Sequence, residues 1–147
     1  MAGLLELVLL LKKSPMFQAV DTQDLRLVAR AVEEQEFFAG DRVFDINHRG
    51  DCMYIIVSGK VGISIDPDPH KKQFIAEIST GECLGEMGML DNLPRSATAH
   101  VLEDTRMLTL EKARLHGLIV RYPELAMGLL RGMSHRLRAA NAWAVTK

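Results

Sequence analysis

The sequence predicts a mainly β protein, an antiparallel jelly roll with helices before and after it. Short apolar or alternating runs follow one another from residue 34 to about residue 110, and glycine-bearing turns separate them. Many short strands at regular spacing are typical of a sandwich or barrel. Most gaps are too short for a crossover helix, so neighbouring strands should pair antiparallel. The helical period dominates only outside this region, which places the main helices towards the two ends of the chain.

Length and composition are those of one globular domain. A chain of 147 residues can bury a single core without disulfides, and 48% of these residues are hydrophobic. The formal net charge of −1 gives no general attraction to nucleic acid or to acidic membranes. Cys52 and Cys83, in a chain without a secretion signal, favour a reducing, cytoplasmic setting in which both are small core residues. We therefore expect one cytoplasmic domain over residues 1–147.

The N-terminal part, residues 1–33, is predicted to be helical. The apolar run at residues 3–11 is too short for a bilayer, which needs roughly 20 apolar residues, so we expect a docking helix and no membrane insertion. Ser14-Pro15 should end this helix, because the residue before proline avoids the helical region. A second helix should begin after an N-cap at Asp21 and end near Glu33.

The β part covers residues 34–110. The loop at residues 66–70 contains two of the five prolines and cannot hold a strand. The expected strands cover residues 36–38, 42–46, 52–57, 61–65, 74–78, 97–102 and 106–110, and the glycine turns between them lie at 39–41, 49–51, 58–60 and 80–82.

The C-terminal part, residues 111–147, is predicted to form two helices. Apolar residues share one face of the first helix: Leu115, Leu118, Ile119 and Tyr122. Pro123 suits the first turn of the next helix, where its missing N–H is not needed. Apolar residues then recur at four-residue steps as far as about Asn141: Leu125, Leu129, Met133 and Leu137.

One segment inside the β part departs from the strand pattern. Residues 85–90 are predicted to form a short helical stretch, followed by an irregular connection at 91–94. The first N–H groups of a helical turn lack partners within it, and with the dipole they favour an anion. The sequence therefore predicts an anion site at this point of the roll.

The segment at residues 81–99, from Gly81-Glu82 to Thr98-Ala99, strongly resembles the phosphate-binding cassette of the cyclic nucleotide-binding domain family. That family includes protein kinase A regulatory subunits, catabolite activator protein and cyclic-nucleotide-gated channels. Residues 38–65 resemble the strands before the cassette, and residues 122–126 resemble the helical region after it. The resemblance implies a regulatory domain that binds cAMP or cGMP and needs no cofactor.

The resemblance also implies roles for individual residues. Glu86 would accept a hydrogen bond from the ribose 2′-hydroxyl. Arg95 would bind the cyclic phosphate, because a guanidinium matches two exocyclic oxygens bidentately and a lysine does not. The remaining members of the expected phosphate site are Gly85, Met87, Gly88 and Ser96. The alternative is a plain surface ion pair between Glu86 and Arg95, which would contribute little.

Recognition of the base stays open between cAMP and cGMP. The Ser96 hydroxyl is compatible with either. Arg136 stands where some channel-type members of the family place an arginine against the base, and a cation over a purine face is favourable. A solvated arginine is the alternative for Arg136, and Trp143 is a second candidate for the cap.

Taken together, these features predict a sensor domain of a larger protein, in which the C-terminal helices move when cyclic nucleotide binds. Such movement requires different affinities for the two arrangements. No catalytic constellation and no paired histidine spacing is present, so neither an enzyme nor a metal site is expected. Nucleic-acid binding by this chain alone is not expected either, since a helix-turn-helix would have to follow Lys147.

The alternative to sensing is a ligand-free jelly-roll interaction module. In that case the last helix would pair with a second copy through Leu130, Met133 and Leu137. The effector domain of a parent protein is the other expected partner.

Overall fold

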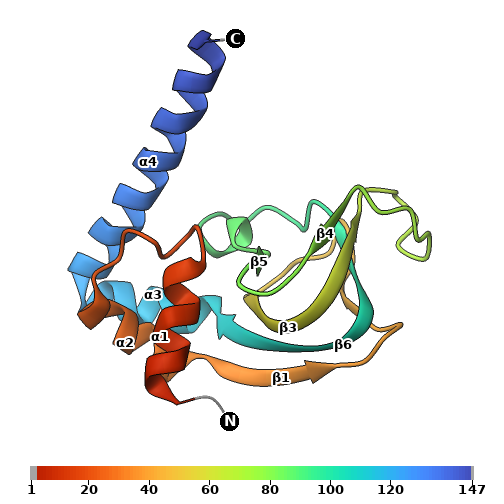
Figure 1. Ribbon diagram of the computed structural model, residues 1–147, viewed down its shortest axis with the longest axis horizontal. Helices are drawn as coiled ribbons and strands as arrows, with labels where there is room; N and C mark the ends of the chain where they lie inside the picture. Colours follow the sequence, from red (N-terminus) through yellow and green to blue (C-terminus); the bar gives the residue numbers. More distant parts are fainter. Residues whose placement is uncertain (1–2, 147) are drawn as a thin grey trace.

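A β roll with helices gathered at one end is the architecture of the computed structural model, which describes residues 3–146 and the side chains of residues 3–142 (Figure 1). Its elements, in chain order, are α1 (Leu4–Lys13), α2 (Thr22–Ala31), β1 (Glu33–Phe37), β2 (Arg42–Phe44), β3 (Cys52–Ser64), β4 (Ala76–Ile78), β5 (Cys83–Leu84), the 3-10 turn η1 (Met87–Met89), β6 (Thr98–Glu111), α3 (Lys112–Arg121) and α4 (Pro123–Thr146). The predicted fold class is confirmed: an antiparallel roll with N-terminal helices, a short cassette helix and two C-terminal helices.

The sheet is built around its two longest strands, β3 and β6. They pair from Cys52 opposite Glu111 to Ser64 opposite Thr98. The strand order is β1-β6-β3-β4, with β2 also pairing β6 and β5 also pairing β3, and every pairing is antiparallel. Both long strands bend as they run, so that the sheet curls into a roll (Figure 1).

The predicted turn at residues 58–60 is wrong, because β3 continues through it. Gly59 has a φ of +112° and lies where the register between β3 and β6 shifts. A Cβ atom on Gly59 would lie 2.2 Å from the Thr105 hydroxyl oxygen. The glycine therefore allows a bulge that bends the strand without ending it. The two strands predicted at residues 97–102 and 106–110 are likewise the single strand β6, which pairs with β3 on both sides of this bulge.

Several other boundaries differ from the prediction. Helix α2 ends at Ala31 and β1 already begins at Glu33, because Glu33 pairs with Thr109 of β6. Asp21 is the N-cap of α2 as predicted, although its side chain makes no capping hydrogen bond. Strand β4 is shorter than predicted, β5 was not predicted, and α4 continues to Thr146.

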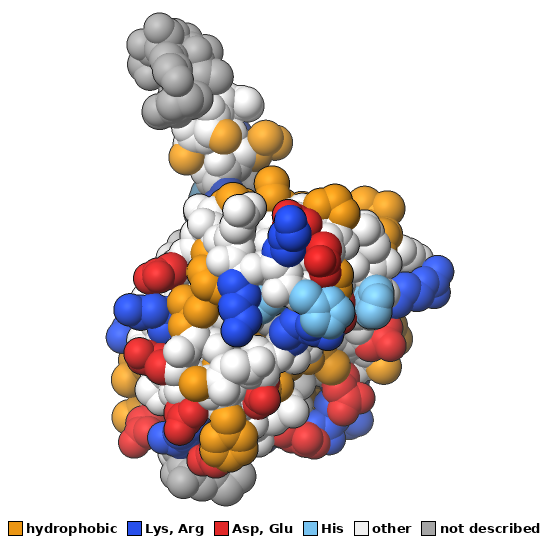
Figure 2. Space-filling view, turned by 90° about the vertical axis from the view of Figure 1, so that its right-hand side faces the viewer, with side chains coloured by type: hydrophobic (Ala, Val, Ile, Leu, Met, Phe, Trp, Pro, Cys, Tyr) orange, Lys and Arg blue, Asp and Glu red, His pale blue; other side chains and the backbone are white. Residues whose placement is uncertain are grey.

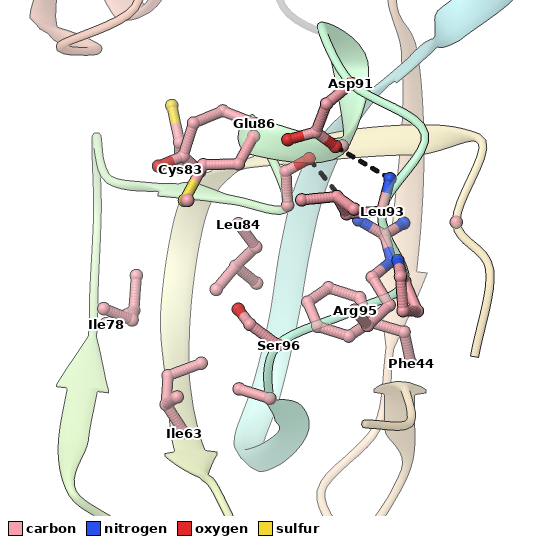
Figure 3. A pocket seen from close by; sticks show the side chains of 16 residues that line it. Phe44, Ile63, Ile78, Cys83, Leu84, Glu86, Asp91, Leu93, Arg95 and Ser96 are labelled. Atoms are coloured by element: carbon pink, nitrogen blue, oxygen red, sulfur yellow. Dashed lines mark hydrogen bonds between the residues drawn. The ribbon is translucent and has the colours of Figure 1, made fainter. Parts of the chain in front are cut away.

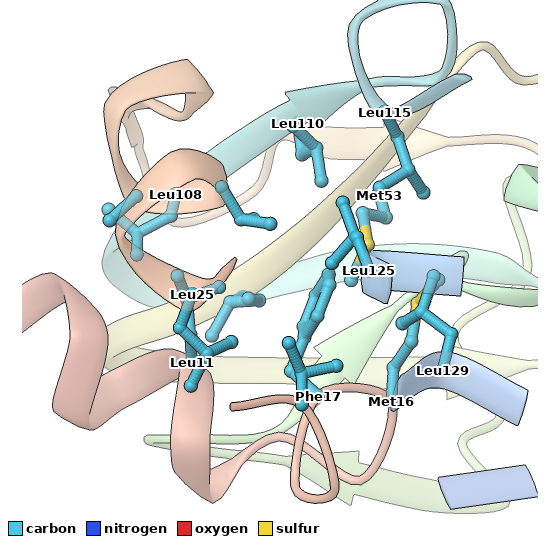
Figure 4. Close-up of a cluster of buried hydrophobic side chains, with 14 of the residues drawn as sticks. Leu11, Met16, Phe17, Leu25, Met53, Leu108, Leu110, Leu115, Leu125 and Leu129 are labelled. Carbon is cyan, nitrogen blue, oxygen red and sulfur yellow. The ribbon is translucent and has the colours of Figure 1, made fainter. Parts of the chain in front are cut away.

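Two hydrophobic clusters lie on opposite faces of the sheet. Side chains alternate along β3, so Met53 and Ile55 face one cluster while Ile56 faces the other. The larger cluster joins the sheet to the helices, with Leu115 of α3 and Leu125 of α4 among its buried members (Figure 4). The smaller cluster fills the inside of the roll. The cassette lies where it contacts both, since Leu84 belongs to the smaller cluster and Met89 to the larger.

Helix α4 leaves the body of the molecule after its first turns (Figure 1). Leu125 and Leu129 are buried, whereas apolar side chains further along the helix are exposed in part: Leu130 (55%), Met133 (42%) and Leu137 (63%). Among the described residues, none of the helices combines the length and apolar character that spanning a bilayer requires.

Candidate functional site

A cavity of about 250 Å³ opens between the cassette and the inner face of the roll (Figure 3). Its lining comes from the cassette, from the inner ends of β3 and β4, and from β2 and the loop that follows it. The lining residues are Phe44, Gly50, Ile63, Ile78, Cys83, Leu84, Gly85, Glu86, Met87, Gly88, Asp91, Leu93, Pro94, Arg95, Ser96 and Ala97. The structure thus brings the predicted cassette residues Gly85, Glu86, Met87, Gly88, Arg95 and Ser96 together around one space.

Arg95 is the central charged group of this cavity, and only 7% of it is exposed. Its Nη2 donates a hydrogen bond to the carbonyl oxygen of Cys52 at 2.7 Å, and its Nη1 donates to the carbonyl of Gly85 at 3.4 Å. Its Cζ lies 4.2 Å from the centre of the Phe44 ring, a cation–π contact. Main-chain oxygens and an aromatic ring therefore hold the guanidinium in position.

No described carboxylate neutralises Arg95. Glu86 and Asp91 line the same cavity, yet among the described residues no acidic oxygen lies within 4.0 Å of the guanidinium. The Nε of Arg95 is buried and has no hydrogen-bond partner among the described atoms. A buried cation without a counter-charge is costly. The alternative of a surface ion pair between Glu86 and Arg95 is therefore wrong.

Two glycines make room for the guanidinium. A Cβ atom on Gly50 would lie 2.0 Å from Arg95 Cζ, and one on Gly85 would lie 2.1 Å from Arg95 Nη1. Gly85 also has a φ of +73°, which disfavours any side chain there. Gly85 was predicted only as a member of the phosphate site, and its contact with Arg95 was not. Gly50 was interpreted only as part of a turn, and no local signal in the sequence marks its contact with Arg95.

The main chain of Arg95 is held as firmly as its side chain. Its N–H donates to the carbonyl of His48, and its carbonyl accepts from the N–H of Asn47, both at 2.8 Å. Asn47 has a φ of +69°, an arrangement that asparagine tolerates better than most residues. The loop between β2 and β3 therefore positions the main chain of the cassette arginine through two hydrogen bonds.

The rest of the cavity combines two acidic residues, Glu86 and Asp91, with apolar walls. Glu86 is half-buried and immediately precedes η1, and its side chain lies at the same end of the cavity as Asp91 (Figure 3). Ser96 is exposed at the lining. The opposite wall is apolar and carries Ile63, Ile78 and Leu84. A ligand with an anionic, hydroxyl-bearing end and a flat, less polar end would match this division.

Arg136 lies outside the cavity. It is exposed on α4 and lines a separate hollow together with Gln18, Ala19, Gly132, His135 and Ala139. The side chain of Trp143, the second candidate for the cap, lies outside the described residues.

The two cysteine thiols and the possible metal ligands do not form a second candidate site within residues 3–142. Burial raises the pKa of Cys83 to about 12, so its thiol stays protonated at neutral pH, and its Sγ lies 2.6 Å from the hydroxyl of Ser14. Burial, followed by the nearby carboxylate of Glu111, raises the pKa of Cys52. Within residues 3–142 no group of His, Cys, Asp and Glu is arranged to hold a metal ion.

Known proteins share both this sequence pattern and this fold. The cyclic AMP receptor protein of Thermus thermophilus is 30% identical over 131 residues, which are 89% of this chain and 61% of that protein. The N-terminal domain of a transcriptional regulator from Streptomyces coelicolor superposes with a TM-score of 0.80 at 30% identity, covering 90% of this chain and 95% of that one.

The regulatory domain of Toxoplasma gondii PKA, solved with cAMP, superposes with a TM-score of 0.71 at 26% identity and covers 78% of this chain and 44% of that one. The chain spans about three fifths of the length of three curated relatives, the Thermus protein and two CRP-like regulators of Mycobacterium tuberculosis.

The model of the family described as the cyclic nucleotide-binding domain matches residues 34–122, which include the roll except for the first residue of β1, the cassette and α3. This match covers more than half of the chain and contains the residues that bring Glu86 and Arg95 to one cavity. The chain belongs to the cyclic nucleotide-binding domain family.

Proposed function

We propose that this chain binds a cyclic nucleotide, cAMP or cGMP, in the cavity beside η1, and that residues 1–147 act as one regulatory domain of a longer protein. The buried, unneutralised guanidinium of Arg95 is the observation that carries the proposal. A cyclic phosphate supplies one negative charge spread over two exocyclic oxygens. Guanidinium N–H groups that the carbonyls of Cys52 and Gly85 do not use would donate to these oxygens.

The other site residues take roles around that contact. Glu86 accepts a hydrogen bond from the ribose 2′-hydroxyl, and the Ser96 hydroxyl adds a donor near the phosphate. Gly85 and Gly88 allow the ligand to approach the main chain, with the amides near Met87 facing the anion. The half-buried position of Glu86 at the cavity and the exposed hydroxyl of Ser96 support these roles.

The base lies against the apolar wall of the cavity in this proposal. Ile63, Ile78 and Leu84 offer a surface for the purine without fixing its exocyclic groups, which leaves cAMP and cGMP both acceptable. Arg136 can cap the base only if α4 moves towards the cavity, since it lies in a different hollow here. Capping of the base by Arg136 therefore requires that the C-terminal helices move. The ligand would favour the arrangement in which α4 covers it.

The proposed output is regulatory and not catalytic. Some of the relatives are named as transcriptional regulators, and one similar structure is a kinase regulatory domain. No cofactor is needed for such a role. An effector domain of a parent protein is the proposed partner. A cyclic nucleotide ligand and two unpaired cysteines favour the cytoplasm. Lys, Arg, Asp and Glu side chains are interspersed on the face shown in Figure 2, which offers no extended basic surface for nucleic acid.

Self-association through α4 is a second candidate function. The exposed apolar side chains of Leu130, Met133 and Leu137 favour it, because they lie on the part of α4 that leaves the body of the molecule. It is compatible with ligand binding and would also serve a ligand-free interaction module.

Isothermal titration with cAMP and with cGMP tests the proposed function. Arg95→Ala should weaken binding of the preferred nucleotide by on the order of 2–5 kcal/mol, at least thirtyfold, because a buried charge-assisted contact is lost. Arg106→Ala is the matched control: Arg106 is exposed and pairs with Glu34, away from the cavity. A well-folded wild-type protein that takes up neither nucleotide would rule the sensing function out.

A further inference from the structure

Two basic side chains of α3 reach back to the end of the cassette. The Nε2 of His116 lies 2.8 Å from the carbonyl oxygen of Met89, the last residue of η1. The Nζ of Lys112 donates to the carbonyl of Asp91 and, at 2.9 Å, to the side-chain oxygen of Asn92. Since a carbonyl can only accept, His116 and Lys112 are the donors in these contacts.

These side chains donate to main-chain carbonyls, of Met89 and Asp91, for which the cassette itself supplies no donor. The last carbonyls of a helical turn have no partner within it, and basic side chains stabilise them. The side chain of Met89 is buried in the larger hydrophobic cluster, to which Leu115 of α3 also belongs. Residues 89–92 are therefore joined to α3 by one buried side chain and by the two donors.

Lys112 also touches the loop that surrounds Arg95. Its main-chain N–H donates to the carbonyl of Asp51 at 2.7 Å. Asp51 stands between Gly50, which leaves the space for the guanidinium, and Cys52, whose carbonyl accepts from Arg95 Nη2. Lys112 thus contacts the end of the cassette through its side chain and the loop beside Arg95 through its main chain, and only the first contact depends on the side chain.

We propose that Lys112 and His116 are positioning residues for cyclic nucleotide binding. They hold the cassette against α3 in the arrangement that presents Glu86 and Arg95 to the ligand, and they make α3 the first element that a shift of the cassette displaces. This inference rests on the proposed function. Arg114 attaches α3 to a different part of the molecule. Its Nη1 donates to the carbonyl of Ala31, the last residue of α2, at 2.7 Å and away from the cassette.

The test compares Lys112→Met and His116→Ala with Arg114→Met. All three remove a side-chain donor to a main-chain carbonyl from the same helix, but only the first two contact the cassette. Each of these two should weaken nucleotide binding about tenfold, through faster dissociation. Arg114→Met should stay within about twofold of the wild type. His116→Gln keeps a donor near the same position and should restore most of the affinity.

Hydrogen exchange gives a readout that needs no ligand. The amides of Leu90 and Asp91 both donate to the carbonyl of Met87, and in the Lys112→Met/His116→Ala protein they should exchange faster than in Arg114→Met. If the wild type binds neither nucleotide, the proposed function fails, and the exchange difference then shows only that Lys112 and His116 hold the cassette against α3. Nucleotide binding equal to wild type in the two cassette-facing variants overturns the inference, and so does unchanged exchange at Leu90 and Asp91.

Discussion

The guanidinium of Arg95 can lie in the wall of the cavity because Gly50 and Gly85 have no side chains. Gly50→Ala tests this arrangement without touching a charged group. The added methyl would lie 2.0 Å from Arg95 Cζ, so the guanidinium has to move. We expect nucleotide binding to fall about tenfold or more, as a bidentate contact tolerates little displacement.

Titration calorimetry checks that expectation, with Gly117→Ala as the control. A Cβ atom on Gly117 would meet no atom within 4 Å, so that variant should bind as the wild type does. Wild-type affinity in Gly50→Ala would mean that the position of the guanidinium does not decide binding.

The resemblance of residues 81–99 to the family's phosphate-binding cassette was enough to predict that Glu86 and Arg95 lie at one site, and both line the same cavity. The neighbours that hold Arg95 could not be predicted. Cys52 acts through its main-chain carbonyl, and Gly50 acts through the absence of a side chain. Both lie more than forty residues before Arg95, Gly50 in the loop before β3 and Cys52 at the start of that strand, and their position depends on the fold of the whole roll. The proposed cap, Arg136, does not reach the cavity, because it lies on α4, a helix that leaves the roll.

The buried side chain of His100 is expected to make the stability of the protein depend on pH. It is 4% exposed, its Nε2 has no hydrogen-bond partner among the described atoms, and its ring packs against Phe74. Burial lowers the pKa of His100 below its usual value of 6.5, and the nearby cations of Arg42 and Lys72 lower it further, although Asp45 acts the other way.

The folded protein therefore binds this proton less readily than the unfolded chain does. The stability due to neutral His100 is complete above about pH 6.5 and is lost as the pH falls towards the lowered pKa, with a slope of at most about 1.4 kcal/mol per pH unit. Urea unfolding between pH 7.5 and pH 5 measures this slope. His100→Gln should flatten it, whereas His135→Gln, at an exposed position on α4, should not. Equal slopes in all three proteins would contradict the role of His100.

At the scale of elements, the sequence located the strands better than it located their ends. Turns and bulges share a signature, a glycine between two apolar runs, because both need a residue free of side-chain clashes. At Gly40 the chain does turn, whereas at Gly59 the ladder continues and Thr105 fills the bulge by accepting from the N–H of Lys60 at 3.2 Å. Only the pairing partner distinguishes the two cases, and that partner lies far away in the sequence.

Two helical glycines offer a matched comparison between α3 and α4. Gly117 has open space around it, while a Cβ atom on Gly128 would lie 3.0 Å from the Cα of Val20. Gly117→Ala should raise stability by about 0.5–1 kcal/mol, because alanine has the higher helix propensity. Gly128→Ala should lower the melting temperature instead, since the start of α4 would be pushed off the segment that precedes α2.

Thermal unfolding followed by circular dichroism measures both changes. A melting temperature that rises equally in the two variants would show that α4 is not closely seated against Val20.

At the scale of the whole molecule, the cassette is the place where the two cores meet. Leu84 packs inside the roll and Met89 packs with the helices, so a ligand that orders the cassette affects both clusters at once. Side chains that point to alternate faces of β3 are what separates the two clusters. The continuous apolar run at residues 52–57 did not show in advance which of them face which cluster. The direction in which α4 leaves the body could not, because its exposed apolar residues follow the same four-residue period as its buried ones.

Those exposed residues carry the last prediction. Leu130, Met133 and Leu137 are 55%, 42% and 63% exposed on a helix that projects from the body, and pairing with the same face of a second copy would remove them from water. We expect the protein to sediment as a dimer at micromolar concentration, and Leu137→Glu to convert it to a monomer that still binds nucleotide. Leu5→Glu, at a leucine of α1 that is 72% exposed, is the control and should leave the dimer intact. A wild type that sediments as a monomer with and without nucleotide would exclude α4 pairing, and these residues would then be available for the inward movement of α4 over the bound base.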